Sequence, residues 1–337
     1  MMSETIRLAE GGGGEATARL IQQIFWSRFR HPELVKGNDA AVLEHSGGRL
    51  AVTTDAFVVT PWSFPGGDIG RLAIAGTVND LTMMGATVLG LTAAFIIEEG
   101  FAKRDLERIA QSMADAAAEA GVSLVAGDTK VVNRGAADGV FITTTGVGTV
   151  EPGLMLGGEL ARPGDKVLIS GTVGDHGAAI LLARGELGLT ADLQSDVAPL
   201  NRMLAPLFTE FAAQLRVLRD PTRGGLATTL NEIARQSQVT IGLDEAAIPV
   251  RPEVRGITEL LGLDPLYLAN EGKAIVVVAP EAAAAVLTKM RQHSLGTAAA
   301  IIGEIGAGHP GMVTLKTRSG GERLIPLGSG EQLPRIC

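Results

Sequence analysis

Residues 161–177 read ARPGDKVLISGTVGDHG, and this stretch decides the fold that the sequence predicts. A Pro-Gly-Asp turn at 163–165 leads into an apolar strand at 166–170, and a glycine-rich turn at 171–177 then leads into a helix. The same alternation of strands and helices has already run once between residues 49 and 148. Because the pattern restarts, we predict an α/β (α+β) protein of two domains, with a boundary near residues 155–162.

On either side of this stretch, the sequence predicts further helices and strands, some of them bounded by cap or turn residues. The helix at 103–120 carries the clearest apolar face, and Asp68 and Gly85 are the expected cap and stop of an earlier helix. The other expected elements are strands at 49–55, 122–126, 139–148 and 274–279, helices at 225–236 and 280–292, a Gly127-Asp128 turn and a late strand pair. We therefore predict an N-terminal domain at 1–158, a C-terminal domain at 159–327 and a flexible tail at 328–337.

Composition narrows the class of protein. The chain has 337 residues, of which 46% are apolar but only 4% aromatic, and its formal net charge is −8. An acidic chain is a poor partner for nucleic acid, which binds clustered lysine and arginine. No apolar run approaches the roughly 18–20 residues that a membrane span needs, and the N-terminus lacks the pattern of a signal peptide. The single cysteine fits a reducing compartment, so we expect a cytoplasmic protein.

Four aspartates at expected turns and strand ends are candidate metal ligands. They are Asp39, Asp55, Asp80, which follows Asn79 inside an apolar helix, and Asp128. Hard carboxylate oxygens suit Mg²⁺ bound with phosphates, and Lys130 could supply a point charge to a phosphoryl oxygen. The alternative for any single aspartate is that it caps a turn. The sequence carries none of the common nucleotide-loop, zinc or nucleophile-elbow motifs.

Three glycine-rich or turn motifs add candidate residues. Gly11–Gly14 could wrap a phosphate with backbone N–H groups, or could be a linker. Asp220 begins Asp-Pro-Thr-Arg-Gly-Gly, in which two glycines allow close approach of the backbone at the start of a helix, or mark that start and nothing more. Glu271 precedes an apolar strand and is either a general base or a glutamate of a surface turn.

Cys337 is the only cysteine and lies behind the linker-like run Gly328-Ser329-Gly330. Ten extended residues span roughly 30 Å, enough to carry a thiol between two sites. The alternative is an incidental exposed thiol. A neighbouring carboxylate raises the pKa of a thiol, and Arg335 would oppose that effect.

These motifs together resemble a known family. They are Phe64-Pro65-Gly66-Gly67, Gly76–Asp80, Gly127–Val132, Ser170–Gly177, Thr222–Gly225, Ala269–Lys273 and Pro334-Arg335-Ile336-Cys337. Over nearly its whole length the chain resembles the HypE hydrogenase maturation factors of the PurM-like (aminoimidazole ribonucleotide synthetase-like) ATP-binding superfamily. It departs from them at Glu10–Gly14, where the family often has His-Gly-Ser-Gly-Gly. The Pro-Arg-Ile-Cys ending looks specific to HypE.

The resemblance implies a fold and a reaction. The fold is a homodimer whose N-terminal sheets pair into a barrel, with a C-terminal α/β sandwich domain and ATP with Mg²⁺ between the domains. A carbamoyltransferase, HypF, would load Cys337. The chain would dehydrate the S-carboxamide to a thiocyanate and pass cyanide to the HypC–HypD complex, for the iron of [NiFe]-hydrogenase.

The resemblance also implies residue roles. Glu271 would be the base, with Lys130 as a second candidate and Arg335 beside the thiol. Nucleotide would be held by Asp39, Asp55, Asn79, Asp80, Asp128, Lys130 and Asp220. Metal would be held by Asp39, Asp55, Asp80 and Asp128.

Two other functions remain open from the sequence. One is a different enzyme of the superfamily, of the thiamine-monophosphate kinase or selenophosphate synthetase type. The other is a non-catalytic carrier that binds nucleotide. The tail cysteine discriminates between them and the dehydratase, because only the dehydratase requires it.

Overall fold

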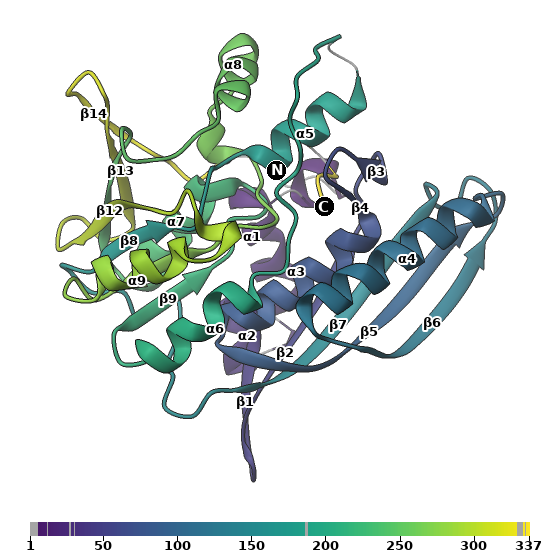
Figure 1. The fold of residues 1–337 in the computed structure, drawn as a ribbon, viewed down its shortest axis with the longest axis horizontal. Coiled ribbons are helices and arrows are strands. Elements are labelled where there is room, and N and C mark those ends of the chain that lie inside the picture. Colours follow the sequence, from purple (N-terminus) through teal and green to yellow (C-terminus); the bar gives the residue numbers. More distant parts are fainter. Residues whose placement is uncertain are drawn as a thin grey trace.

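Two β-sheets organise the chain, one in each half (Figure 1). The computed structural model describes residues 6–11, 13–26, 28–29, 31–185, 188–328, 333 and 335–337. Its helices are η1 Leu8–Gly11, α1 Gly14–Leu20, η2 Ile21–Trp26, α2 Pro32–Lys36, α3 Ile69–Met83, α4 Lys103–Ala120, α5 Asp175–Arg184, α6 Asn201–Glu210, α7 Gly225–Gln236, α8 Pro252–Leu261, η3 Pro265–Tyr267, α9 Ala283–Arg291 and η4 Ser294–Gly296. Its strands are β1 Ala41–His45, β2 Gly48–Phe57, β3 Ser63–Phe64, β4 Gly67–Asp68, β5 Ala86–Glu98, β6 Leu124–Val132, β7 Val140–Val150, β8 Lys166–Ile169, β9 Leu215–Arg219, β10 Thr240–Asp244, β11 Ile275–Val278, β12 Ala300–Gly306, β13 Met312–Lys316 and β14 Glu322–Leu324.

The first sheet has the strand order β1-β2-β7-β5-β6, in which only β5 and β6 pair in parallel. Helices α3 and α4 cover one of its faces (Figure 1). Almost every residue of α3 is buried, because the helix lies between the sheet, α4 and α6. Close packing of the two helices requires Gly70, where a Cβ would come within 2.5 Å of the Ile109 carbonyl oxygen. Asp68 caps α3 by accepting a hydrogen bond from the Arg71 N–H, as predicted.

The second sheet has the order β14-β13-β10-β12-β8-β11-β9. Its central strands β8 and β11 are almost wholly buried, because helices and loops cover both faces. Helix α7 packs on one side with the apolar cluster around Leu226 and Ile241, and α6 and α9 pack on the other with the cluster around Leu204 and Val286. The mixed α/β class is thereby confirmed; the domain limits at 158 and 327 stay predictions.

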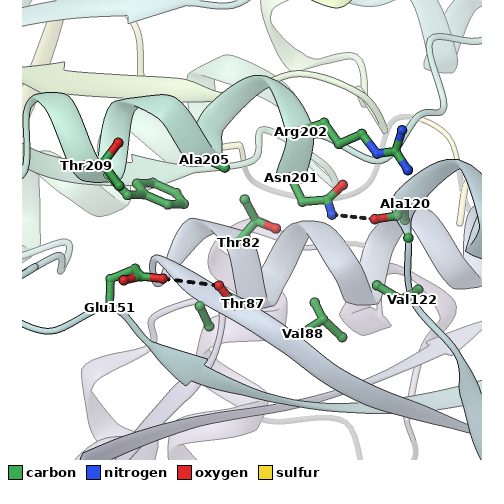
Figure 2. Close-up of a pocket in the computed structure, with 13 residues that line it drawn as sticks. Thr82, Thr87, Val88, Ala120, Val122, Glu151, Asn201, Arg202, Ala205 and Thr209 are labelled. Carbon is green, nitrogen blue, oxygen red and sulfur yellow. Dashed lines mark hydrogen bonds between the residues drawn. The ribbon is translucent and has the colours of Figure 1, made fainter.

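The two halves contact each other along α3, α4 and α6. Figure 2 shows a cavity of about 320 Å³ on this seam, where Asn201 at the start of α6 donates a hydrogen bond to the Ala120 carbonyl at the end of α4. On its other wall Thr87 and Glu151 hydrogen-bond to each other. The seam fixes α3 against the C-terminal half, and α3 carries Asn79 and Asp80.

The structure corrects two expectations about strands. The predicted strand 122–126 with a Gly127-Asp128 turn is wrong, because β6 runs unbroken through Asp128, which lies opposite Ala94 of β5. The strand expected to end at Asp55 continues to Phe57. In both cases pairing with a neighbouring strand overrides a local turn signal.

In the described part of the chain, no helix combines the length and the apolar character needed to cross a bilayer.

Candidate functional site

Four aspartates, of which Asp220 is buried and the other three are partly buried, converge on a cavity of about 660 Å³ between the two halves. Asp39 lies just before β1, Asp55 in β2, Asp80 in α3 and Asp220 just after β9. One carboxylate oxygen each from Asp39, Asp80 and Asp220 lies within 4.8 Å of the other two. The predicted nucleotide residues Asp39, Asp55, Asp80 and Asp220 are thus brought together, and Asp220, which we had not assigned to metal, lies inside the carboxylate cluster.

The carboxylate cluster has more negative charge than its protein neighbours neutralise. Arg219 lies 2.6 Å from Asp39 and also pairs with Glu232, at 3.0 Å. Burial raises the pKa of Asp39 to about 6, and burial also raises the pKa values of Asp55, Asp80 and Asp220. The Oδ2 atom of Asp39 is buried without a hydrogen-bond partner. An all-oxygen donor set with an unpaired buried oxygen fits a hard divalent cation such as Mg²⁺.

Backbone segments rich in glycine form another wall of the cavity. Gly13 and Gly14, both with positive φ, line it together with Thr222 and Arg223. A Cβ on Gly13 would lie 3.3 Å from the Arg223 Cβ, and the Arg223 guanidinium donates to the Gly11 carbonyl at 3.1 Å. Gly11 and Gly13 therefore contact Arg223 of the Asp220 turn, whereas Gly14 lies against Gly328. Gly12 lies outside the described residues. Such closely approaching backbone is typical of phosphate-binding loops.

Glu10 does not line this cavity. Its carboxylate accepts a hydrogen bond from the backbone N–H of Arg7 at 2.7 Å, within the turn that η1 forms. The position where the HypE family often has histidine therefore lies outside the lining of this cavity.

Glu271 is a buried carboxylate beside the cluster. Its side chain has an oxygen, Oε1, without a hydrogen-bond partner. Burial raises its pKa well above the usual value, and the charges of Asp220, Asp196 and Asp55 add to the effect. A carboxylate with a raised pKa in a site is a candidate general base, whereas a surface-turn glutamate would be exposed. The alternative of a surface turn at Glu271 is therefore wrong.

Asp196 holds Glu271 in place, and the sequence analysis missed it. Its carboxylate accepts from the backbone N–H groups of Glu271 and Gly272 and from Lys273 Nζ, at 3.1, 3.3 and 2.9 Å. Burial opposes ionisation, but the charge of Lys273 and the hydrogen bonds from Lys273 and from the Glu271 N–H are among several effects that together lower the pKa of Asp196. Asp196 lies in a loop without periodicity. The only signal was Lys273, a lysine beside an apolar strand that needs a counter-ion when buried.

Asn79 joins the two halves at the same point. Its amide donates to the Ala198 and Glu271 carbonyls and accepts from the Leu200 N–H, at 3.1, 3.5 and 2.8 Å. The side chain is thus engaged with the backbone of the C-terminal half and positions Glu271. Its assignment to nucleotide stays a prediction.

Asp128 and Lys130 lie apart from the cluster within one chain. They are on the edge strand β6, where the two side chains are 63% and 70% exposed and pair at 2.8 Å. A hydrogen bond from Lys130 lowers the pKa of Asp128. The prediction that Asp128 lies at a strand end together with Asp39 is therefore not met within a single chain.

The described end of the tail is docked. Arg335 donates to the Val58 carbonyl at 2.9 Å and pairs with Asp138, and the Cys337 carbonyl accepts from the Val58 N–H at 2.9 Å. Ile336 is buried in the N-terminal apolar cluster, which Cys337 also contacts. The C-terminus lies beside the β3–β4 hairpin and α5 (Figure 1). Residues 329–332 and Pro334 lie outside the described residues. The guanidinium of Arg335 is engaged in anchoring the tail.

Family models match both halves of the chain. The model "AIR synthase related protein, N-terminal domain" matches residues 37–150, and "AIR synthase related protein, C-terminal domain" matches residues 162–316. Both belong to the PurM-like architecture expected from the sequence.

Relatives that match over the full length identify the family more narrowly than the two domain models do. "Carbamoyl dehydratase HypE" of Rhizobium leguminosarum bv. viciae is 52% identical over 332 residues, covering 98% of this chain and 95% of the relative. The crystal structure of HypE in complex with ATP is 50% identical, with a TM-score of 0.83 over 99% of this chain and 100% of the other. The HypE–HypF complex structure is 48% identical, with a TM-score of 0.88 over 92% and 99%. These matches confirm the resemblance of the motifs, and the chain belongs to the HypE family of carbamoyl dehydratases within the AIR synthase related proteins.

Proposed function

We propose that this chain uses ATP to dehydrate an S-carboxamide on Cys337 to a thiocyanate, which supplies the cyanide ligand of the [NiFe]-hydrogenase iron. One observation supports this above all. The end of the tail docks near the Glu271 segment, because the His176 ring lies 2.8 Å from the Ile336 carbonyl oxygen and 2.7 Å from Ser195 Oγ. The residue after Ser195 is Asp196, which accepts a hydrogen bond from the Glu271 N–H. The curated relatives named as carbamoyl dehydratases support the same reaction. Intact-mass spectrometry of the loaded chain tests it.

The reaction needs phosphate as a leaving group. The amide oxygen of Cys–S–C(=O)–NH₂ attacks the γ-phosphorus of ATP and ADP leaves. The C–O bond then breaks with its electron pair going to phosphate, while the nitrogen loses both protons and forms the C≡N triple bond. The products are the thiocyanate, ADP, phosphate and a proton.

Glu271 is the base that takes a proton from the amide nitrogen in this proposal. Burial makes it a stronger base than an exposed glutamate once it is ionised. Asp196 and Asn79 hold its backbone from two sides, which fixes the carboxylate without occupying Oε1. Arg335 acts through the tail, by anchoring the segment that carries the thiol.

The carboxylate cluster holds Mg²⁺ and the ATP phosphates in this proposal. Mg²⁺ bound there would offset the charge on the transferring phosphoryl group. Asp39, Asp80 and Asp220 provide its oxygen ligands with Asp55 beside them, and the backbone of Gly13, Gly14 and Arg223 lines the part of the cavity suited to phosphates.

Replacing Asp80 with asparagine tests this cluster. Mg²⁺ with ATP at about 100 times its dissociation constant should stabilise the unchanged chain by about 2.7 kcal/mol, and the variant should lose most of that gain. Without ligand the variant should melt no lower than the unchanged chain, because the substitution removes one of three adjacent negative charges. Thermal shift assays with and without Mg²⁺–ATP measure both effects.

Asp115→Asn, on the exposed face of α4, is the matched control and should keep the full ligand shift. A normal Mg²⁺–ATP shift in Asp80→Asn would remove the cluster as the metal site.

A second copy of the chain covers the open edge of the first sheet in this proposal. Leu89, Val125 and Val131 on β5 and β6 are 61%, 66% and 68% exposed, which is an apolar surface at an unpaired strand edge. Pairing of the sheets across β6 would form the expected dimer barrel. It would also place Asp128 and Lys130 next to the partner copy, where they could serve its site.

The partners follow from the same proposal. HypF is the carbamoyl donor, in line with the solved HypE–HypF complex, and HypC–HypD is the cyanide acceptor in the cytoplasm. The other enzymes weighed, of the thiamine-monophosphate kinase or selenophosphate synthetase type, and the non-catalytic carrier are set aside. The full-length relatives that are about half identical to this chain carry the dehydratase name.

A further inference from the structure

His176 joins the body of the protein to the tail. It is the second residue of α5 and is fully buried. Its Nε2 atom lies 2.8 Å from the carbonyl oxygen of Ile336, and its Nδ1 atom lies 2.7 Å from Ser195 Oγ. The ring also packs edge-on against Phe64, at 5.4 Å between centroids. Neither the relatives' names nor the proposed chemistry gives His176 a role.

The hydrogen bonds fix which ring nitrogen carries the proton. A carbonyl oxygen only accepts, so Nε2 donates to Ile336. Nδ1 then accepts from the Ser195 hydroxyl, whose oxygen accepts in turn from the Val197 N–H at 3.1 Å. Burial lowers the pKa of His176, so the ring is neutral and can hold this one tautomer. Ser195 therefore orients the ring so that its N–H meets the tail.

The tail has other contacts with the body of the protein, and they lie one residue before the hydrogen bond between His176 and Ile336. Arg184, also on α5, donates to the carbonyls of Thr60 and Arg335, each at 3.1 Å. The Thr60 N–H donates to the same Arg335 carbonyl at 3.3 Å. These contacts lie one residue before Ile336, whereas His176 binds the carbonyl directly preceding Cys337. The histidine thus contacts the tail at the carbonyl group that is bonded to the nitrogen of the thiol-bearing residue.

We propose that His176, oriented by Ser195, is a positioning residue that retains the docked tail. It thereby sets the balance between the docked state, in which Cys337 is dehydrated, and the released state, in which Cys337 is presented to the carbamoyl donor. The inference rests on the proposed function for its consequence, but the retention itself is a property of the structure. Loss of the hydrogen bond from His176 leaves the buried Ile336 carbonyl without a donor in the docked state, whereas water can bind it in the released state. The loss therefore favours release of the tail. A released thiol is accessible for loading and removed from Glu271.

Alkylation of the thiol measures tail release without any enzymatic activity. The chain has one cysteine, so modification by iodoacetamide reports on Cys337 alone. His176→Phe keeps a ring against Phe64 and removes the donor, and should speed alkylation about five- to tenfold. His176→Gln places an amide donor near the position of Nε2 and should stay within about twofold of the unchanged chain. Ser195→Ala leaves the ring unoriented and should speed alkylation about two- to threefold.

Two results would overturn the inference. The first is alkylation of His176→Phe, or of Ser195→Ala if the phenylalanine variant does not fold, at the rate of the unchanged chain. The second is an equal acceleration in the Phe and Gln variants, which would mean that packing and not the donor holds the tail. Rates in denaturant should be identical in all variants, which controls for the reactivity of the thiol itself.

A second readout separates this inference from the proposed function. With the carbamoyl donor and ATP, His176→Phe should raise the ratio of carbamoylated to cyanated Cys337, and His176→Gln should restore it. Failure to form thiocyanate in the unchanged chain would refute the function and leave the alkylation result standing. An unaltered ratio despite faster alkylation would overturn the link between retention and dehydration.

Discussion

Glu271→Gln is expected to leave Cys337 carbamoylated and to slow its dehydration by about 10²- to 10⁴-fold. Glutamine has nearly the shape of glutamate but cannot accept the amide proton. The backbone contacts of Glu271 with Asp196 and Asn79 do not involve its side chain, so the segment should keep its position. Single-turnover reactions of preloaded protein, quenched and followed by mass spectrometry, measure the rate.

Stability is the control for this variant. Glu271 is buried with an unpartnered oxygen beside Asp220 and Asp196, so removing its charge should leave the melting temperature unchanged or raise it. A normal dehydration rate in Glu271→Gln would exclude Glu271 as the base and direct attention to Lys130 of a partner copy. A drop in melting temperature would assign the carboxylate a structural role instead.

Cys337→Ala is expected to abolish formation of the thiocyanate while leaving ATP binding within about twofold of normal. The sulfur is the only attachment point for the carboxamide in the proposed reaction. The cavity that binds ATP in the proposal is lined by other parts of the chain, and the Val58 N–H donates to the backbone carbonyl of Cys337, which the substitution keeps. Isothermal titration with ATP and Mg²⁺ measures binding, and detection of labelled cyanide on the protein measures product.

The matched control for Cys337→Ala is Met155→Ala, which removes another sulfur-containing side chain from an exposed position outside the site. That variant should form product normally. Cyanated product from Cys337→Ala, attached anywhere on the chain, would contradict the role of the thiol as the covalent carrier.

Local sequence patterns predicted α4 and α7 well, whereas α1, α2, α6 and α8 were not predicted. The limits of α4 and α7 agree with the expected 103–120 and 225–236, because an amphipathic face and glycines at the boundaries define both. Strands were harder. The thirteen-residue β5 was not predicted, although Gly85 and Gly100 flank it. In addition, β6 was cut at Gly127-Asp128 by a turn signal that strand pairing overrides.

The site could be predicted only in part. Asp39, Asp55 and Asp220 each stood next to a local turn or strand-end motif and Asp80 stood out as a charge inside an apolar helix, and the structure brings all four together. Asp196 and His176 could not be identified as site residues, because their partners are distant in sequence. Lys273 is 77 positions from Asp196, and Ile336 is 160 positions from His176. The docked end of the tail was hidden for the same reason, since a short polar segment without periodicity reads as a linker.

Conversion of the carboxamide to the thiocyanate on Cys337 is the step that defines the proposed dehydratase, and it can be followed by mass. The chain is incubated with the carbamoyl donor system, first without and then with Mg²⁺–ATP, and its intact mass is followed over time. We expect a carbamoyl adduct on Cys337 that is stable without ATP and becomes lighter by one water when ATP is added, with ADP and phosphate released in equal amounts. An adduct that persists unchanged in the presence of Mg²⁺–ATP, or a loss of water without ATP, would contradict the proposed reaction.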